Sequence, residues 1–276
     1  MSYSFDAENH IHYFDKNPLI GTTTALGIID KPLQWWASGM AVGEFGWLHK
    51  PNGNGEFSEN TLERRLESAS RNQVAISEMD AGEYLHKLDI AYAAHNTKKV
   101  KTADDGVALH AALEQFIQEE IDNTPEPLRQ TIDEKISPFV EWSMKNVKQF
   151  LFTELHCYET MLWVGGIADF GYIDMEDKFV LGDFKSAKDI YYQNLLQIGG
   201  YDIQLMENGG VDKNGKLIMK FRKQFDYHAI FAKRIGLDKP FFNYAVKEAK
   251  DGFTNAIGLY KNKMFFDKNV LPKKKW

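Results

Sequence analysis

Apolar positions along this chain change their spacing near residue 150, and the change separates a helical first part from a mixed second part. In the first part apolar residues recur at helical spacing, as at Leu62, Leu66 and Ala69. A short hairpin is expected over about residues 6–17, before the first helix. The helices that the spacing predicts begin near Ala25 and after Pro32, and then cover about residues 59–94, 106–123 and 128–148.

The second part begins with β-rich runs separated by short turns. The strands that these runs predict cover Phe150–Tyr158, Met161–Asp174 and Lys178–Lys185. A helix at about Ile190–Glu207, a strand at Phe225–Arg234 and a helix at about Phe242–Lys263 follow. This order predicts an α/β fold in which helices flank a mixed central sheet, with a large helical N-terminal region.

The polar run HNTKKVKTADD at residues 95–105 is interpreted as the connection between these two parts. We therefore expect a mainly helical region over residues 1–105 and a core with a C-terminal helix over residues 106–276. The two regions are expected to form one compact unit, since 276 residues suffice for one large domain.

Composition narrows the class of protein. Hydrophobic residues make up 43% of the chain and charged residues 26%, which is ordinary for a globular protein. The single cysteine, Cys157, excludes an intramolecular disulfide, a cysteine-ligated zinc site and a four-cysteine iron–sulfur cluster. Its β-rich surroundings predict an inert buried thiol.

Charge and hydropathy bear on partners and location. The apolar stretches are too short to span a bilayer, and Met1–His10 lacks the basic start and apolar run of a secretory signal. We therefore expect a cytoplasmic protein with no membrane partner. A net charge of −6 argues against a protein that coats nucleic acid nonspecifically, but it leaves open an enzyme with a local basic channel.

Candidate chemistry is concentrated in the stretch GGIADFGYIDMEDKFVLGDFKSAK, residues 165–188. Asp169 lies inside one predicted strand and Asp183 near the end of the next, so the short turn between these strands brings the two carboxylates together. Lys185 follows Asp183 at the strand period of two and points to the same side. Two close carboxylates are unfavourable unless a cation joins them.

Carboxylates of this kind bind Mg²⁺ or Mn²⁺, which prefer oxygen ligands and activate bound water. A lysine beside them can orient that water or offset charge on a phosphate. Together these groups suffice for phosphodiester hydrolysis. The alternative is structural, because a D-x-K triplet is also common as a salt pair on an exposed strand.

Two helical pairs strengthen the chemical interpretation. His110 and Glu114 in GVALHAALE lie four residues apart on one helical face, where they can bind a metal ion or form a surface pair. Gln197 and Tyr201 in LLQIGGYDIQL have the same spacing and can hydrogen-bond a phosphate or line a packed helix. The adjacent Gly199–Gly200 indicates close approach by another group.

The ordered set G-x-x-x-H-x-x-x-E, G-G-x-x-D, D-F-K-S and Q-x-x-x-Y, over residues 106–201, resembles the RecB-like branch of the PD-(D/E)XK nucleases. The resemblance implies a restriction-endonuclease-like core with Mg²⁺ or Mn²⁺ as cofactor. It implies that His110, Asp169, Asp183 and the main-chain carbonyl of Phe184 are metal ligands. It also implies that Lys185 is the catalytic lysine, that Glu114 is a supporting acid, and that Gln197 and Tyr201 form the downstream motif.

The N-terminal run GTTTALGIIDKPLQWWASGMA is similar to the entry segment of phage exonucleases and of the mitochondrial genome maintenance exonuclease in this branch. This similarity implies an exonuclease on single-stranded DNA ends that leaves 5′-phosphates, with N-terminal helices as a wall or arch over the site. Alternatives are an endonuclease on branched or duplex DNA, a hydrolase of small phosphoesters, and a non-catalytic DNA-binding module.

Candidate DNA contacts lie outside the core motifs. Trp35 and Trp36 can stack on unpaired bases, although packing in a helical core is the alternative for either ring. Lys98, Lys99 and Lys188 are candidate contacts to the phosphate backbone.

Overall fold

The computed structural model describes residues 2–29, 34–46, 59–186, 189–233 and 235–271. The chain divides into two compact units, one made of Met1–Ile29 with Gly106–Trp276 and the other of Asp30–Asp105. Sequence spacing groups residues 1–105 together, whereas the first 29 residues belong with the later part of the chain. The reason is strand pairing, because Ile20 and Gly21 pair with Val164 and Gly165.

The first unit is built on a mixed sheet with the strand order β11-β10-β7-β6-β5-β8-β9, to which β4 adds by pairing with β6. Strands β5, β6 and β7 form the expected antiparallel meander. Strand β10 runs parallel to β7, which makes the sheet mixed as predicted. The strands are β4 (Ile20–Gly21), β5 (Val147–Glu159), β6 (Val164–Asp174), β7 (Phe179–Lys185), β8 (Gly210–Val211), β9 (Leu217–Met219), β10 (Tyr227–Ala232) and β11 (Phe241–Asn243).

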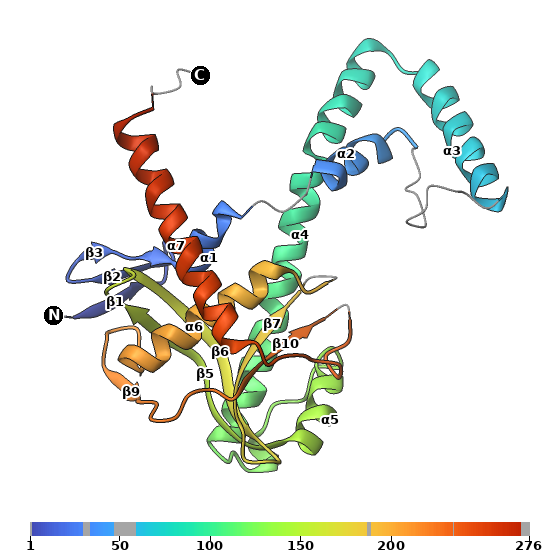
Figure 1. The fold of residues 1–276 in the computed structure, drawn as a ribbon. Coiled ribbons are helices and arrows are strands. Elements are labelled where there is room, and N and C mark those ends of the chain that lie inside the picture. The colour runs from blue at the N-terminus through green and yellow to red at the C-terminus, as the bar shows by residue number, and fades with distance from the viewer. Residues whose placement is uncertain (1, 30–33, 47–58, 187–188, 234, 272–276) are drawn as a thin grey trace. The chain divides into compact units, whose positions relative to one another are not determined.

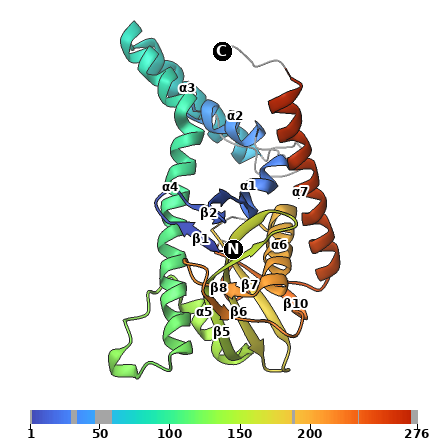
Figure 2. The same ribbon diagram turned by 90° about the vertical axis from the view of Figure 1, so that its left-hand side faces the viewer.

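Helices cover both faces of this sheet (Figures 1 and 2). The part of α4 (Ala81–Ile121) that belongs to this unit packs with α5 (Ser137–Asn146) on one face, around the fully buried Phe139 and Phe170. Helix α6 (Tyr192–Asn208) packs on the other face against strands β5 to β7, where the buried Cys157 lies. Helix α7 (Val246–Asn269) packs on α6. The α/β class with a mixed sheet is therefore confirmed.

The N-terminal segment forms a small sheet of its own, from β1 (Tyr3–Asp6), β2 (Ile11–Phe14) and β3 (Asn17–Pro18). The Tyr3 hydroxyl lies 2.6 Å from Nδ1 of His12 and 3.1 Å from Nδ1 of His156, which ties this sheet to β5. Burial and the neighbouring His156 lower the pKa of His12 to about 3. A helical turn, α1 (Thr22–Ala25), and a 3-10 turn, η1 (Leu26–Ile28), follow β4.

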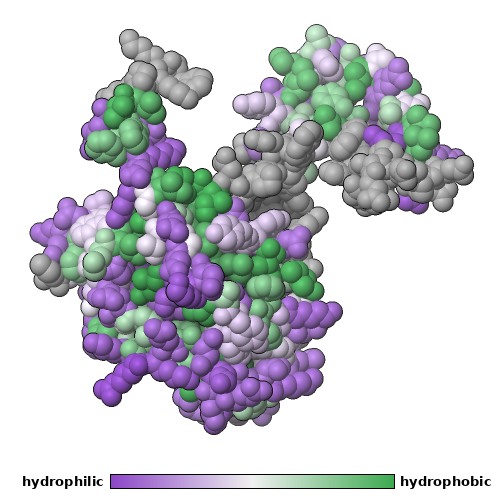
Figure 3. Space-filling view, in the orientation of Figure 1, coloured by the Kyte–Doolittle hydropathy of each residue, from purple (hydrophilic) through white to green (hydrophobic). Residues whose placement is uncertain are grey.

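The second unit contains α2 (Gln34–Gly43), α3 (Glu59–Ser77) and the first part of α4. Between α3 and α4 the Asp80 carboxylate accepts the Glu83 N–H, and the Glu83 carboxylate accepts the Asp80 N–H, a capping box that starts α4. Many apolar side chains of these helices are exposed, among them Leu66 at 63% and Leu85 at 59%. The space-filling view accordingly shows hydrophobic patches on α3 and α4, whereas hydrophilic residues dominate the lower part of the sheet unit (Figure 3).

Two expected elements differ in extent. Residues 95–105 continue α4 instead of ending a helix. The run lacks both proline and glycine, and its three lysines and one alanine are good helix formers. The helix expected at about 128–148 begins only at Ser137, where Pro138 suits a first turn, and residues 126–128 form a separate 3-10 turn, η2 (Glu126–Leu128).

Among the described residues, every helix is too short or too polar to cross a membrane.

Candidate metal centre

The two aspartates of the sequence motif lie side by side at the end of the β6–β7 pairing. Phe170 pairs with Gly182, and Asp169 and Asp183 each lie one residue beyond that pair. The Phe184 N–H donates a 2.7 Å hydrogen bond to Oδ2 of Asp169, so the backbone of the D-x-K triplet contacts the first aspartate. The short turn between the strands therefore brings the two carboxylates together, as the sequence predicts.

Asp183 and Lys185 form a close ion pair inside the protein. Asp183 is fully buried, and Nζ of Lys185 lies 2.7 Å from its Oδ1 and 2.6 Å from its Oδ2. Only the contact with Oδ1 has hydrogen-bond geometry, which leaves Oδ2 without a hydrogen-bond partner among the described residues. Oδ2 is therefore close to the Lys185 ammonium but accepts no hydrogen bond from the described part of the chain, which leaves lone pairs on this buried oxygen for a further cation or donor.

Helix α4 supplies an imidazole to the same place. Nδ1 of His110 lies 3.8 Å from Oδ2 of Asp169, and the His110 side chain is one-third exposed. Glu114 lies one turn further along α4, is exposed, and raises the pKa of Glu154 through its charge. The pair predicted on one helical face therefore lies beside the aspartates.

Glu154 completes the cluster, although it lies outside the sequence motifs that predict the site. One ligand atom from each of His110, Glu154 and Asp169 lies within 4.8 Å of the other two. These side chains come from α4, β5 and β6, so the sheet and one flanking helix build the centre together. Two carboxylates and an imidazole at this spacing form a set that can hold a divalent cation.

A backbone irregularity in β5 places Glu154. Its φ of 44° is left-handed, a conformation that L-residues adopt at a cost of about 1–2 kcal/mol. Every second residue of β5 is buried from Phe150 to Phe152, and the same alternation resumes at Leu155. The alternation therefore changes phase across Thr153 and Glu154. The sequence carries this signal, because the apolar alternation of Phe150 and Phe152 shifts to Leu155 and Cys157. A polar residue at such a break is a candidate for function.

The electrostatics of the cluster favour a bound cation. Burial, with the charges of Asp169, Glu114 and Asp183, raises the pKa of Glu154 to about 8. Burial likewise raises the pKa of Asp183, although the Lys185 ammonium opposes the shift. Carboxyl groups that resist ionisation in each other's presence are stabilised as anions when a divalent ion joins them.

Helix α6 presents the downstream pair to this centre. Nε2 of Gln197 donates a 2.8 Å hydrogen bond to the Tyr201 hydroxyl, so the two predicted residues contact each other. Burial raises the pKa of Tyr201 well above its usual range, and the charges of Asp169 and Asp183 add to the shift. Tyr201 therefore stays a neutral phenol beside the acidic cluster.

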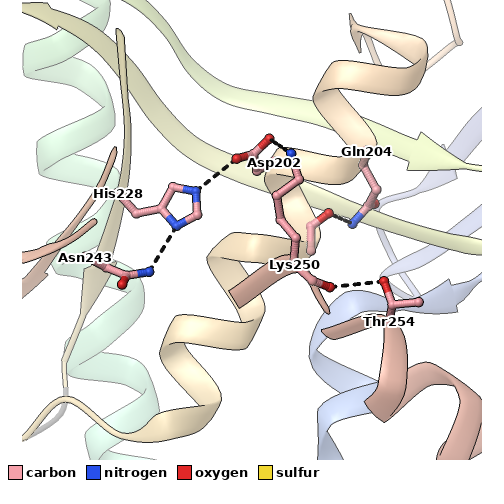
Figure 4. Close-up of polar contacts among 7 residues, drawn as sticks. Asp202, Gln204, His228, Asn243, Lys250 and Thr254 are labelled. Carbon is pink, nitrogen blue, oxygen red and sulfur yellow. Dashed lines mark hydrogen bonds and ion pairs between the residues drawn. The ribbon is translucent and has the colours of Figure 1, made fainter. Parts of the chain in front are cut away.

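A buried polar network holds α6 in place (Figure 4). Asp202 accepts from Nε2 of His228 on β10 at 3.0 Å and from Nζ of Lys250 on α7 at 3.0 Å. Oδ1 of Asn243 accepts a hydrogen bond from the Ala245 N–H, so the Nδ2 of Asn243 faces Nδ1 of His228 at 3.5 Å. Because Nδ1 then accepts a hydrogen bond, the proton of the His228 ring is assigned to Nε2. The helix that carries Gln197 and Tyr201 is thus fixed to both the sheet and α7.

A cavity of about 230 Å³ opens beside the cluster. Side chains of the cluster form one wall, and the N-terminal segment forms the other. The lining residues are His10, His12, Gly21, Thr22, Thr23, Thr24, His110, Glu154, Gly165, Gly166, Ile167, Asp169 and Tyr201. Gly166 is required here, because a Cβ at this position would lie 2.6 Å from the Tyr201 ring and 2.7 Å from the Thr22 hydroxyl.

The structure does not test the predicted DNA contacts. Trp35 and Trp36 belong to α2, and Lys98 and Lys99 to α4, but their side chains lie outside the described part of the structure. Lys188 lies outside the described residues altogether. The metal-ligand role of the Phe184 carbonyl and the wall or arch of N-terminal helices likewise stay predictions.

The chain matches no protein-family model and no curated protein sequence. The chemistry of the centre is therefore the basis for the function proposed below.

Proposed function

We propose that this protein is a metal-dependent nuclease that hydrolyses phosphodiester bonds of DNA, acting on the ends of single strands and leaving 5′-phosphates. One observation carries the proposal. Ligand atoms of His110, Glu154 and Asp169 converge within 4.8 Å of one another, beside the buried Asp183–Lys185 pair. Metal ligands with an adjacent lysine are the groups that phosphodiester hydrolysis needs.

The residues present fit a magnesium or manganese ion. Two carboxylates and one imidazole offer mainly hard oxygen ligands, and the unsatisfied Oδ2 of Asp183 lies next to them. His110, Glu154, Asp169 and Asp183 would hold the ion. When bound, it supplies an activated water and a Lewis acid for a phosphoryl oxygen.

Lys185 is proposed as the group that acts on the substrate. Its ammonium is held by both oxygens of Asp183 and is mostly buried, with 16% of the side chain exposed. An ammonium fixed in this way offsets negative charge that develops on a phosphate in the transition state. Gln197 and the Tyr201 phenol are proposed to orient the phosphate or its attacking water by hydrogen bonding.

The fold that we propose is a restriction-endonuclease-like core. Its support is the order of elements, in which α4 precedes the β5–β6–β7 meander and α6 is followed by β10 parallel to β7. The proposed substrate follows from the cavity. At about 230 Å³ it is far too small to enclose a duplex, which favours a single strand that passes over the centre.

A panel of labelled DNAs tests the activity and the substrate class. Linear single-stranded, linear duplex and circular single-stranded DNA of equal mass would be incubated with the full chain and Mg²⁺ or Mn²⁺, and in parallel with excess EDTA. We expect stepwise shortening of linear single strands, intact circles and no product in EDTA.

Each other result bears on a particular part of the proposal. Circles degraded as fast as linear strands would identify an endonuclease. Cleavage that persists in EDTA, or no cleavage of any substrate with either metal, would contradict the proposed function itself.

A further inference from the structure

A second cavity, of about 450 Å³, lies at the other end of the sheet from the metal centre. Its lining comes from α5, the end of β6 and the turn after it, the start of β10, and β11 with the following Tyr244. The volume falls within the roughly 300–1,000 Å³ range of small-ligand pockets. Neither the metal centre nor the proposed nuclease reaction uses this space.

Three aromatic rings at steep angles form one wall. Tyr227 stands at 89° to Phe242, with ring centroids 5.4 Å apart, and at 44° to Tyr244, with centroids 5.2 Å apart. Phe242 and Tyr244 are inclined by 48° at 6.5 Å. Trp142 adds a further ring to the lining. Rings that pack on one another in this way form an aromatic wall beside the cavity, and an exposed ring of such a wall can receive an organic cation.

The charge of the lining has the matching sign. Three carboxylates, those of Asp174, Glu176 and Asp226, line the cavity with one lysine, Lys178. Asp226 also pairs with Lys223 at 2.8 Å. Three carboxylates against the two lysines, Lys178 and Lys223, leave one negative charge in excess. This balance repels a phosphate and attracts a cation.

The hydrogen bonds of Asp174 indicate which kind of cation the cavity can bind. Its Oδ1 accepts the N–H groups of Glu176 and Lys178, and its Oδ2 accepts the Tyr227 hydroxyl at 2.7 Å. These donors are neutral, so the carboxylate keeps its charge while its oxygens are engaged. A hard metal ion would need free oxygens. A weakly hydrated organic cation needs only the field and the aromatic faces.

We propose that this cavity binds the guanidinium group of an arginine in a basic peptide segment of a partner protein. The exposed ring of Tyr244 can stack on the planar guanidinium while Tyr227 and Phe242 support that ring, and the carboxylates of Asp174 and Glu176 balance its charge. This site is independent of the nuclease reaction, so either proposal can fail without the other.

The test measures binding of N-acetyl-argininamide to the full chain by calorimetry, with N-acetyl-citrullinamide as the neutral ligand of the same shape. We expect the cationic probe to bind and the neutral one to bind at least about 10-fold more weakly. Tyr244→Ala should weaken binding of the cationic probe about 2- to 30-fold, the range of one cation–π contact. Tyr244 is 71% exposed, so its loss leaves the core intact.

Matched variants locate the site. Tyr92→Ala removes a tyrosine that is 83% exposed in the other unit and should leave binding unchanged. Tyr244→Phe should retain binding, because it keeps the ring. Glu154→Gln should also leave binding unchanged, which excludes the acidic metal centre as the site. Equal binding of the two probes, no binding of the cation, or unchanged affinity in Tyr244→Ala would overturn the proposal.

Discussion

At Glu154 the chain adopts a left-handed backbone conformation inside a strand, and the side chain reaches His110 and Asp169. Burial and three neighbouring acids raise the pKa of this carboxyl group, so the position is unfavourable for the protein alone. Strain and repulsion at one residue are typical of a site built for a ligand. The divalent cation that we propose would relieve this repulsion between the carboxylates.

Glu154→Gln tests this interpretation at the residue scale. The change keeps the shape of the side chain and removes one anionic ligand, so Mn²⁺ binding measured by calorimetry should weaken about 10-fold or more. Glu141→Gln, at an exposed acid on α5, is the matched control and should bind Mn²⁺ like the unmodified chain. Equal Mn²⁺ affinity in the two variants would remove Glu154 from the centre.

At the scale of elements, the position of α6 determines where Gln197 and Tyr201 lie. The two glycines noted in the sequence allow α7 to approach, because a Cβ on Gly199 would lie 2.6 Å from the Ala249 carbonyl carbon and one on Gly200 would lie 2.7 Å from the Phe253 ring. The Asp202–His228 contact fixes the same helix to β10. Close packing and a buried polar network thus act together on one element.

Gly199→Ala should separate α6 from α7. The added methyl group meets backbone atoms that cannot rotate away, so the free energy of unfolding in urea should fall by about 1–3 kcal/mol. Gly258→Ala on α7 is the control, because a Cβ there meets nothing within 4 Å. That control should be neutral or gain up to about 1 kcal/mol from helix propensity. A Gly199→Ala protein as stable as the control would contradict the close crossing.

Residue spacing and short motifs predicted those parts of the fold that depend on neighbours close in sequence. The meander and α6 follow from residue spacing, and the D-x-K triplet at a strand end places Asp183 beside Lys185. The extent of α4 was missed, because a polar run was taken as a connection although nothing in it breaks a helix. Glu154 was missed because its role depends on a phase shift in β5 and on pairing with a strand that comes later in the chain.

At the scale of the whole molecule, the sheet unit carries two candidate sites with different lining chemistry. One end presents carboxylates, an imidazole and a buried lysine, which suit a metal ion and a phosphate. The other end presents aromatic rings with an excess of negative charge, which suit an organic cation. The net charge of −6 is consistent with both sites, because each of them concentrates acids.

The central claim is that the cluster around Asp183 and Lys185 cleaves DNA, and Lys185→Ala tests it most directly. Cleavage of end-labelled single-stranded DNA with Mn²⁺ would be measured for the unmodified chain, Lys185→Ala and Lys261→Ala, the last at an exposed lysine on α7. We predict a rate at least about 100-fold lower in Lys185→Ala, as for loss of one electrostatic stabiliser, and an unchanged rate in Lys261→Ala. Equal rates in all three proteins would contradict the account.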